Sequence, residues 1–270
     1  MTAAEGSGRD PIEGLIGRAL GIEVRDVLRE PLGTEHGVES ERVRFAAGDA
    51  ERTLLFERMS PRRALSVQLL PFLARKTDRV PIVHARGIPP RHVVAPRWLL
   101  LEDLADAPGA CDGDVREVLD AKLSIESAVA RDVPALRALG VPERAPGAIA
   151  SDIAEAAAGQ PDAAEIAAEA RESARRMAKL PVALVHGDLR CRNVVATDRG
   201  VVISGWGNAY IGCALLDVVR LVADVIERGE AVLGIGLSRL YAEKVGIVLP
   251  TEVLRGAEKL DRLALRYLDR

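Results

Sequence analysis

The stretch that most constrains the fold of this chain is residues 182–217, which read VALVHGDLRCRNVVATDRGVVISGWGNAYIGCALLD. Short apolar runs alternate there with a polar loop that starts at His-Gly-Asp and with glycine-containing turns. Apolar runs of this length, bounded by turn residues, are typical of buried strands. The pattern predicts a strand–loop–strand unit over 182–204.

The first third of the chain has the pattern of an antiparallel sheet. Val43 and Phe45 alternate with arginines, AAGDAER can form a turn, and residues 53–56 give a second apolar run. These features predict a β-hairpin. Ser60 and Pro61 predict a helix start, with Ser60 as the cap. The other predicted elements are strands over 80–84 and 98–101 and helices over 114–131, 161–179, 213–228, 230–245 and 251–268, after a flexible leader over 1–10.

The composition is that of a globular protein with a core of aliphatic side chains. The chain has 270 residues, of which 48% are hydrophobic and 29% charged, enough for one large domain or a two-lobed unit. A net charge of −3 argues against nucleic-acid binding through a broad basic surface. The first ten residues lack a signal-peptide apolar run, and no stretch approaches the roughly 20 apolar residues of a membrane span, so we expect a cytoplasmic protein.

The three cysteines are Cys111, Cys191 and Cys213, widely spaced and without a Cys-x-x-Cys pair. An odd number at such spacing indicates neither a disulfide framework nor a zinc site. We expect all three to be free thiols in a reducing compartment.

The segment 182–217 resembles the catalytic segment of the aminoglycoside phosphotransferase and choline kinase-like family. His186, Gly187, Asp188 and Asn193 stand at the spacing of the family's HGDxxxxN motif, and Trp206, Gly207 and Asp217 follow in its order. WLLLEDLADA at 98–107 is similar to the strand and hinge of that family, and LLFERMSP at 54–61 to the strand that normally ends in a lysine.

The resemblance implies an α+β, bilobal, protein-kinase-like fold. We expect a small N-terminal lobe of antiparallel sheet with one helix over residues 1–104. A larger, mainly helical C-terminal lobe over 105–270 would hold the catalytic-loop segment.

The resemblance also assigns roles in the loop. Asp188 matches the catalytic base that accepts the substrate proton, and Asn193 matches a metal ligand. His186 is expected to brace the loop by hydrogen bonds, and Asp217 to brace it from the start of a helix. Arg190 and Arg192 flank the loop and are candidates for binding an anion. The alternative is that the whole loop is retained only for folding.

The groups that would hold the phosphates of ATP are missing. The position of the family's lysine is Glu57, and the first lysine of the chain is Lys76. Arg58 would substitute only if the strand register shifted by one, since neighbouring strand residues point to opposite faces. Otherwise Arg58 is a surface charge. No acid occurs between Pro61 and Lys76, where Ser66 or Gln68 would stand nearest the place of the lysine's partner.

The expected metal ligands are also incomplete. Gly205 stands where the family has an aspartate, and Asn208 and Cys213 replace two further acids. Because magnesium prefers carboxylate and other oxygen ligands, Asn193 alone would hold it poorly. The turn over 31–41 carries three glutamates that would repel phosphate, unless they point to water.

Three functions fit these residues. The first is a pseudokinase, with impaired ATP and magnesium binding, that serves as a binding or partner module. The second is a divergent ATP- and magnesium-dependent O-phosphotransferase, with Asn193, Arg58 and the hinge residues Glu102 and Leu104 contacting the nucleotide. The third uses the fold for acid–base chemistry by Asp188, His186 and Arg190. The expected partner is a small-molecule or peptide substrate or another protein, with no nucleic acid and no membrane.

Overall fold

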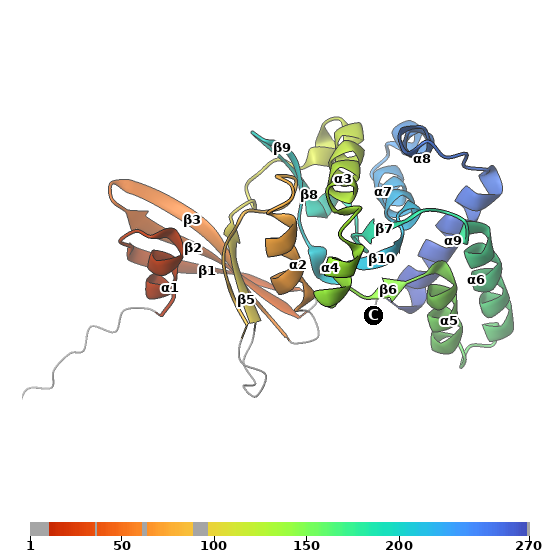
Figure 1. Ribbon diagram of the computed structural model, residues 1–270, viewed down its shortest axis with the longest axis horizontal. Coiled ribbons are helices and arrows are strands. Elements are labelled where there is room, and N and C mark those ends of the chain that lie inside the picture. Colours follow the sequence, from red (N-terminus) through yellow and green to blue (C-terminus); the bar gives the residue numbers. More distant parts are fainter. Residues whose placement is uncertain (1–10, 36, 61–63, 89–96, 269–270) are drawn as a thin grey trace, which may run out of the picture. The chain divides into compact units, whose positions relative to one another are not determined.

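The computed structural model describes residues 11–35, 37–60, 64–88 and 97–268 (Figure 1). Within them the chain divides into two compact units. One runs up to Ala74 and includes Pro81–Asp106, and the other consists of Arg75–Val80 and the chain from Ala107 onward. None of the helices in these ranges combines the length and the apolar character needed to cross a lipid bilayer.

The first unit is built on a five-stranded antiparallel sheet in the order β1-β2-β3-β5-β4. Its strands are β1 (Arg25–Glu35), β2 (Val38–Ala47), β3 (Ala50–Met59), β4 (Val83–Gly87) and β5 (Arg97–Glu102). Val43 of β2 pairs with Leu54 of β3 around the turn at Gly48, which confirms the predicted hairpin. The strand predicted over 98–101 is also confirmed as β5, whereas β4 begins at Val83 instead of Val80.

One face of the sheet packs against a helix that the sequence did not predict. Helix α1 (Pro11–Leu20) buries Ile12 and Ile16. The sheet residues packed in the same core cluster are Val43, Phe45, Leu54, Phe56 and Leu100. The even-numbered positions of β3 therefore face α1, because strand residues alternate between faces.

The opposite face of the sheet, with the odd-numbered positions of β3, meets helix α2 (Leu65–Leu73). The Ser66 hydroxyl donates a hydrogen bond to the Met59 sulfur at 3.2 Å, so this α2 residue contacts β3. Helix α2 has Ala64 at its N-cap without a side-chain cap, so the predicted start at Ser60 is wrong; Pro61 lies outside the described residues.

The second unit is mainly helical. Its helices are α3 (Val115–Val129), α4 (Val133–Ala138), α5 (Pro146–Ala156), α6 (Ala163–Met177), α7 (Leu215–Glu227), α8 (Ala231–Val245) and α9 (Thr251–Tyr267). The predicted helices over 114–131, 161–179 and the C-terminal part are confirmed, and Asp114 caps α3 by accepting from the Arg116 N–H. The sequence missed the short helices α4 and α5.

Two small sheets carry the loop segment within the helical unit. Strand β7 (Val182–Val185) pairs with β10 (Tyr210–Cys213), which also pairs with β6 (Glu143–Arg144). A separate hairpin joins β8 (Val194–Thr197) to β9 (Gly200–Ile203). The predicted strand–loop–strand unit is therefore confirmed. An antiparallel sheet unit with a mainly helical unit is the α+β, kinase-like fold class that we expected, with α1 as an additional helix (Figure 1).

Candidate active site

The His-Gly-Asp loop follows β7, and a buried carboxylate accepts hydrogen bonds from its backbone. Asp217, in the first turn of α7, accepts hydrogen bonds from the backbone N–H of His186 at 2.6 Å and of Gly187 at 2.9 Å. Its side chain is 1% exposed. The prediction that Asp217 braces the loop is confirmed.

His186 has both ring nitrogens engaged within the fold. Nδ1 accepts from the Asp188 N–H at 3.2 Å, so Nε2 carries the proton and donates to the Ser204 carbonyl at 2.6 Å. The ring packs edge-on against Trp206, and burial lowers the His186 pKa. His186 therefore braces the loop, as expected, and has no nitrogen left for proton transfer to a substrate.

The turn of the loop requires glycine at position 187. Gly187 has φ +82°, and a Cβ there would lie 2.2 Å from the Asn208 carbonyl oxygen. This close approach brings the loop against the short helix η4 (Trp206–Asn208). Trp206 is buried, with Nε1–H bonded to the Ile203 carbonyl, so its ring belongs to the core.

Arginines surround the Asp188 carboxylate on both of its oxygens. Arg192 donates to Oδ2 at 2.7 Å, and Arg190 Nε lies 2.9 Å from Oδ1. Arg220 of α7 contributes a guanidinium nitrogen 3.8 Å from Oδ1. The side chain of Asp188 is 13% exposed, so water screens these charges less than it would at an exposed carboxylate.

The arginines outweigh the effect of burial on the proton affinity of Asp188. Burial raises its pKa, but the hydrogen bond from Arg192 and the charges of Arg192, Arg190 and Arg220 bring the pKa below the ordinary value. A carboxylate with a depressed pKa is a weak proton acceptor. The stability it contributes is present above the unfolded pKa of about 3.9 and is lost as the pH falls through the lower folded value.

Arg220 is a site residue that the sequence analysis missed. It is buried, bonds to the Gly187 carbonyl, and binds Asp261 of α9 through Nε at 3.0 Å and NH2 at 2.7 Å. A buried arginine needs such partners. The only signal in the sequence was a charged residue within the apolar pattern of 215–222, and its partner is 41 residues away.

Asn193 lies where the resemblance places it, beside position 205. Its Nδ2 donates to the Asp188 carbonyl at 2.7 Å and approaches Oδ2 at 3.3 Å. A Cβ on Gly205 would lie 3.1 Å from the Asn193 Oδ1, so a side chain at 205 would reach this amide.

These residues do not fit a magnesium site. Position 205 supplies no carboxylate, and the nearby carboxylate of Asp188 is bound to arginines. Over the described ranges, no three His, Cys, Asp or Glu side chains gather to hold a metal. Of the metal ligands that the resemblance implies, the chain thus keeps the amide of Asn193. Magnesium prefers several oxygen ligands that include carboxylates.

A buried ion pair supports the loop from α3. Lys122 Nζ lies 3.4 Å from Asp217 Oδ2 and also contacts Glu126 one helical turn away. Burial lowers the Lys122 pKa, and the charge of Asp217 opposes that shift. The sequence analysis read 114–131 only as a helix and missed Lys122 because its partner lies in α7.

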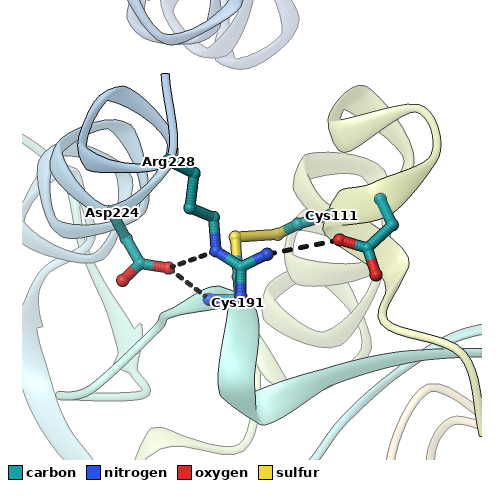
Figure 2. Close-up of a disulfide and its surroundings, with 5 residues drawn as sticks. Cys111, Cys191, Asp224 and Arg228 are labelled. Carbon is teal, nitrogen blue, oxygen red and sulfur yellow. Dashed lines mark hydrogen bonds and ion pairs between the residues drawn. A yellow bond between two sulfur atoms is a disulfide. The ribbon is translucent and has the colours of Figure 1, made fainter. Parts of the chain in front are cut away.

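The expectation of three free cysteines is wrong. Cys111 and Cys191 form a disulfide, with Cα atoms 5.5 Å apart, and only Cys213 among the cysteines is free (Figure 2). Spacing rules detect pairs that are close in sequence, whereas these two are 80 residues apart and meet through the fold.

A small pocket lies beside the loop within the helical unit. Its volume is about 90 Å³, and its walls include Gly187, Asn208 and Tyr210 together with two arginines, Arg144 and Arg220. Asp261 is the acid of its lining and already binds Arg220. Arg144 stacks over the Tyr210 ring and pairs with the exposed Asp152.

The sheet unit places the residues expected to handle phosphate as follows. Glu57 pairs with Leu99 in β5, and burial raises its pKa to about 7, so the family's lysine position carries no positive charge in either protonation state. Arg58 NH2 binds Glu41 at 2.8 Å and Glu39 at 3.2 Å. Arg58 thus pairs with two glutamates of β2. The turn expected over 31–41 is wrong in extent, because 31–35 belong to β1 and 38–41 to β2.

The expected hinge residues, Glu102 and Leu104, lie at and just after the end of β5. The Glu102 carboxylate accepts from the Ile82 N–H at 2.8 Å, and the Glu102 N–H donates to the Ile82 carbonyl. Leu104 follows and is half-buried. Glu102 therefore joins β5 to the residues before β4.

The sequence matches the family described as the phosphotransferase enzyme family over residues 33–245. A comparison with curated protein sequences gave no match.

Solved aminoglycoside phosphotransferases have the same fold. APH(3'')-Id from Streptomyces rimosus is 19% identical, with 94% of this chain and 99% of that chain covered and a TM-score of 0.58. An aminoglycoside-3'-phosphotransferase of type VIII is 17% identical, with 94% and 100% covered and a TM-score of 0.59. Spectinomycin phosphotransferase APH(9)-Ia, solved with ADP and spectinomycin, is 12% identical, with 96% and 88% covered and a TM-score of 0.58.

The support of the loop by Asp217 gives a first prediction. Asp217→Asn weakens the two hydrogen bonds from the loop backbone and leaves Glu126 as the remaining carboxylate beside buried Lys122, so we expect a loss of about 1.5–3 kcal/mol in the free energy of unfolding. Urea unfolding at neutral pH measures it. Asp152→Asn, at an exposed ion pair, is the control and should change the stability by less than about 1 kcal/mol. Equal effects of the two variants would contradict the bracing role.

Proposed function

The chain belongs to the phosphotransferase enzyme family, and on that premise we propose that it is a pseudokinase that uses the family's fold as a binding module. Phosphoryl transfer depends on a base for the acceptor hydroxyl and on cations and metal ions for the phosphates. Both requirements are impaired in this chain.

The state of Asp188 is the observation that carries the proposal. Arg190 and Arg192 each occupy one of its carboxylate oxygens, and Arg220 lies close behind. An acceptor hydroxyl would therefore compete with these arginines for the carboxylate oxygens. The lowered pKa then makes Asp188 a poor proton acceptor even when it is reached.

The phosphate-handling groups support the same proposal. The lysine position is Glu57, Arg58 is bound by Glu39 and Glu41, and Ser66 contacts Met59 in the region where a lysine–acid pair would link the strand to the helix. Position 205, beside Asn193, is a glycine and supplies no carboxylate. The carboxylate that does lie near Asn193 is that of Asp188, which is bound by arginine.

A divergent, ATP-dependent phosphotransferase is the second candidate. The contact between Asn193 and Asp188 favours it, because the family's base and one metal ligand remain side by side. Acid–base chemistry by Asp188 on a non-nucleotide substrate is a weaker third candidate, since His186 has both ring nitrogens engaged.

We also propose the pocket beside Gly187 as the ligand site and a small molecule with a phosphate or carboxylate group as its ligand. Arg144 and Arg220 outnumber Asp261 in the lining, and a volume of about 90 Å³ suits one small charged group. The Arg144–Asp152 pair is exposed, so an anion can replace Asp152 at little cost. The proposed location of the protein is the cytoplasm.

A rescue experiment tests whether the chain lacks the groups that bind ATP together with magnesium. In isothermal titrations with ATP, we expect magnesium to leave the affinity of the wild-type protein unchanged. In the double variant Glu57→Lys/Gly205→Asp, magnesium should raise the affinity about tenfold or more, because a phosphate cation and a metal carboxylate are restored. Gly205 has φ +78°, a conformation that aspartate tolerates better than most residues.

The matched control for this rescue is Glu51→Lys/Gly246→Asp. It makes the same substitutions at an exposed strand position and at another glycine with positive φ, and it should behave as the wild type. Tight, magnesium-enhanced ATP binding by the wild type, or its transfer of phosphate to an acceptor, would refute the pseudokinase proposal.

The ligand pocket gives a separate prediction. At constant ionic strength, millimolar inorganic phosphate should raise the melting temperature of the wild type, and the shift should disappear in Arg144→Ala. Arg137→Ala, which removes an exposed arginine outside the pocket lining, should keep the shift. Stabilisation by streptomycin but not by phosphate would contradict an anionic ligand, as would equal phosphate shifts in the two variants.

A further inference from the structure

A disulfide fixes the loop that carries Asp188 to a distant part of the helical unit. Cys111 lies in the short helix η2 (Ala110–Asp112), and Cys191 is the first residue of η3 (Cys191–Asn193). The bond joins residues 80 positions apart, and it adds a covalent link to the backbone contacts of 108–109 with 195–196 beside it.

An ion network crosses the same junction. Asp224 of α7 accepts from the Cys191 N–H at 2.8 Å, and Arg228 Nε lies 3.9 Å from Asp224. Arg228 also reaches Asp112, next to Cys111, at 3.3 Å. In Figure 2 dashed lines connect Asp224 to Arg228 and to Cys191, whose sulfur is bonded to that of Cys111. The disulfide is thus the covalent member of a junction whose other members are polar contacts.

Cys191 stands between the two arginines that hold Asp188. Arg190 precedes it and Arg192 follows it, and the Asn193 N–H donates to the Arg190 carbonyl to close the η3 turn. Fixing the Cα of Cys191 therefore fixes the backbone from which both guanidinium groups reach the carboxylate. Arg192 is 47% exposed, so its ion pair alone holds the loop weakly.

We propose that Cys111 and Cys191 are a reversible redox site that sets the order of the loop over residues 187–193. In the oxidised form the disulfide holds the arginines on Asp188. In the reduced form Asp224, Arg228 and the backbone contacts of 108–109 with 195–196 still hold the junction, but the covalent restraint on Cys191 is lost and the loop over 187–193 becomes less ordered. This inference goes beyond the proposed function, because it concerns the loop and not the ligand.

The chemistry is thiol–disulfide exchange with a low-molecular-weight thiol and its disulfide, of the glutathione class. A thiolate attacks the Cys111 sulfur, the S–S bond breaks, and Cys191 leaves as a thiolate that takes up a proton. A second thiolate attacks the mixed disulfide and releases Cys111, so two thiols are oxidised to one disulfide and the protein gains two electrons and two protons. The reverse reaction reoxidises the pair.

Access at the junction suits this exchange. Cys111 is half-buried whereas Cys191 is 3% exposed, so Cys111 is the cysteine that a small thiolate can approach. Cys213 is buried and free, and it takes no part.

Hydrogen exchange of the whole chain tests the proposal without any assay of activity. The protein is equilibrated with glutathione disulfide or with dithiothreitol, and thiols are counted after denaturation. We expect one thiol in the oxidised form, from Cys213, and three in the reduced form. Peptides over 187–193 should exchange about tenfold or more faster after reduction, and the melting temperature should fall by roughly 5–10 °C.

Two variants control the experiment. Cys111→Ser should exchange like the reduced protein under both conditions, and Cys213→Ser should keep the full redox response. Three thiols after equilibration with glutathione disulfide would overturn the proposal. Equal exchange of 187–193 in the two forms would also overturn it, even with the disulfide present. Neither outcome bears on ATP or phosphate binding, so failure here and failure of the proposed function are separable.

Discussion

The interaction on which the site depends is the contact of two arginines with one carboxylate. Arg190 and Arg192 lie on the two oxygens of Asp188, the predicted catalytic base, and Arg220 adds a third positive charge from α7. Each exposed ion pair is weak, but three cations around a partly buried carboxylate favour its charged form at neutral pH. Positive charge is therefore plentiful at this loop, and the carboxylates of Asp188 and Asp261 both lie against it.

The buried residues that hold the loop backbone bind it more firmly than the arginines bind Asp188. Asp217 accepts two backbone N–H groups beneath the loop, Lys122 neutralises it, and Gly187 allows the turn that no other residue would fit. Buried polar groups of this kind must be satisfied, or the fold loses stability. The fold can therefore keep the loop geometry whatever residues stand at positions 57 and 205.

Local patterns made much of this predictable. The apolar runs of 182–204, the hairpin around Gly48 and the helix from Val115 follow from turn residues and periodicity. The partners of the buried charges and of Cys111 could not be predicted from local patterns. The pairs Arg220–Asp261, Lys122–Asp217 and Cys111–Cys191 join residues far apart in sequence. Helix α1 was missed because a short helix takes its stability from packing against the sheet and not from its own sequence.

The pKa of Asp188 is the quantity that tests this account most directly. A pH titration of the protein with ¹³C-labelled aspartate, assigned by Asp188→Asn, follows the carboxyl carbon by NMR. The account predicts a pKa below the ordinary value of about 3.9 that rises in Arg192→Ala. A pKa at or above the ordinary value, or one that Arg192→Ala leaves unchanged, would show that the arginines do not restrain this carboxylate.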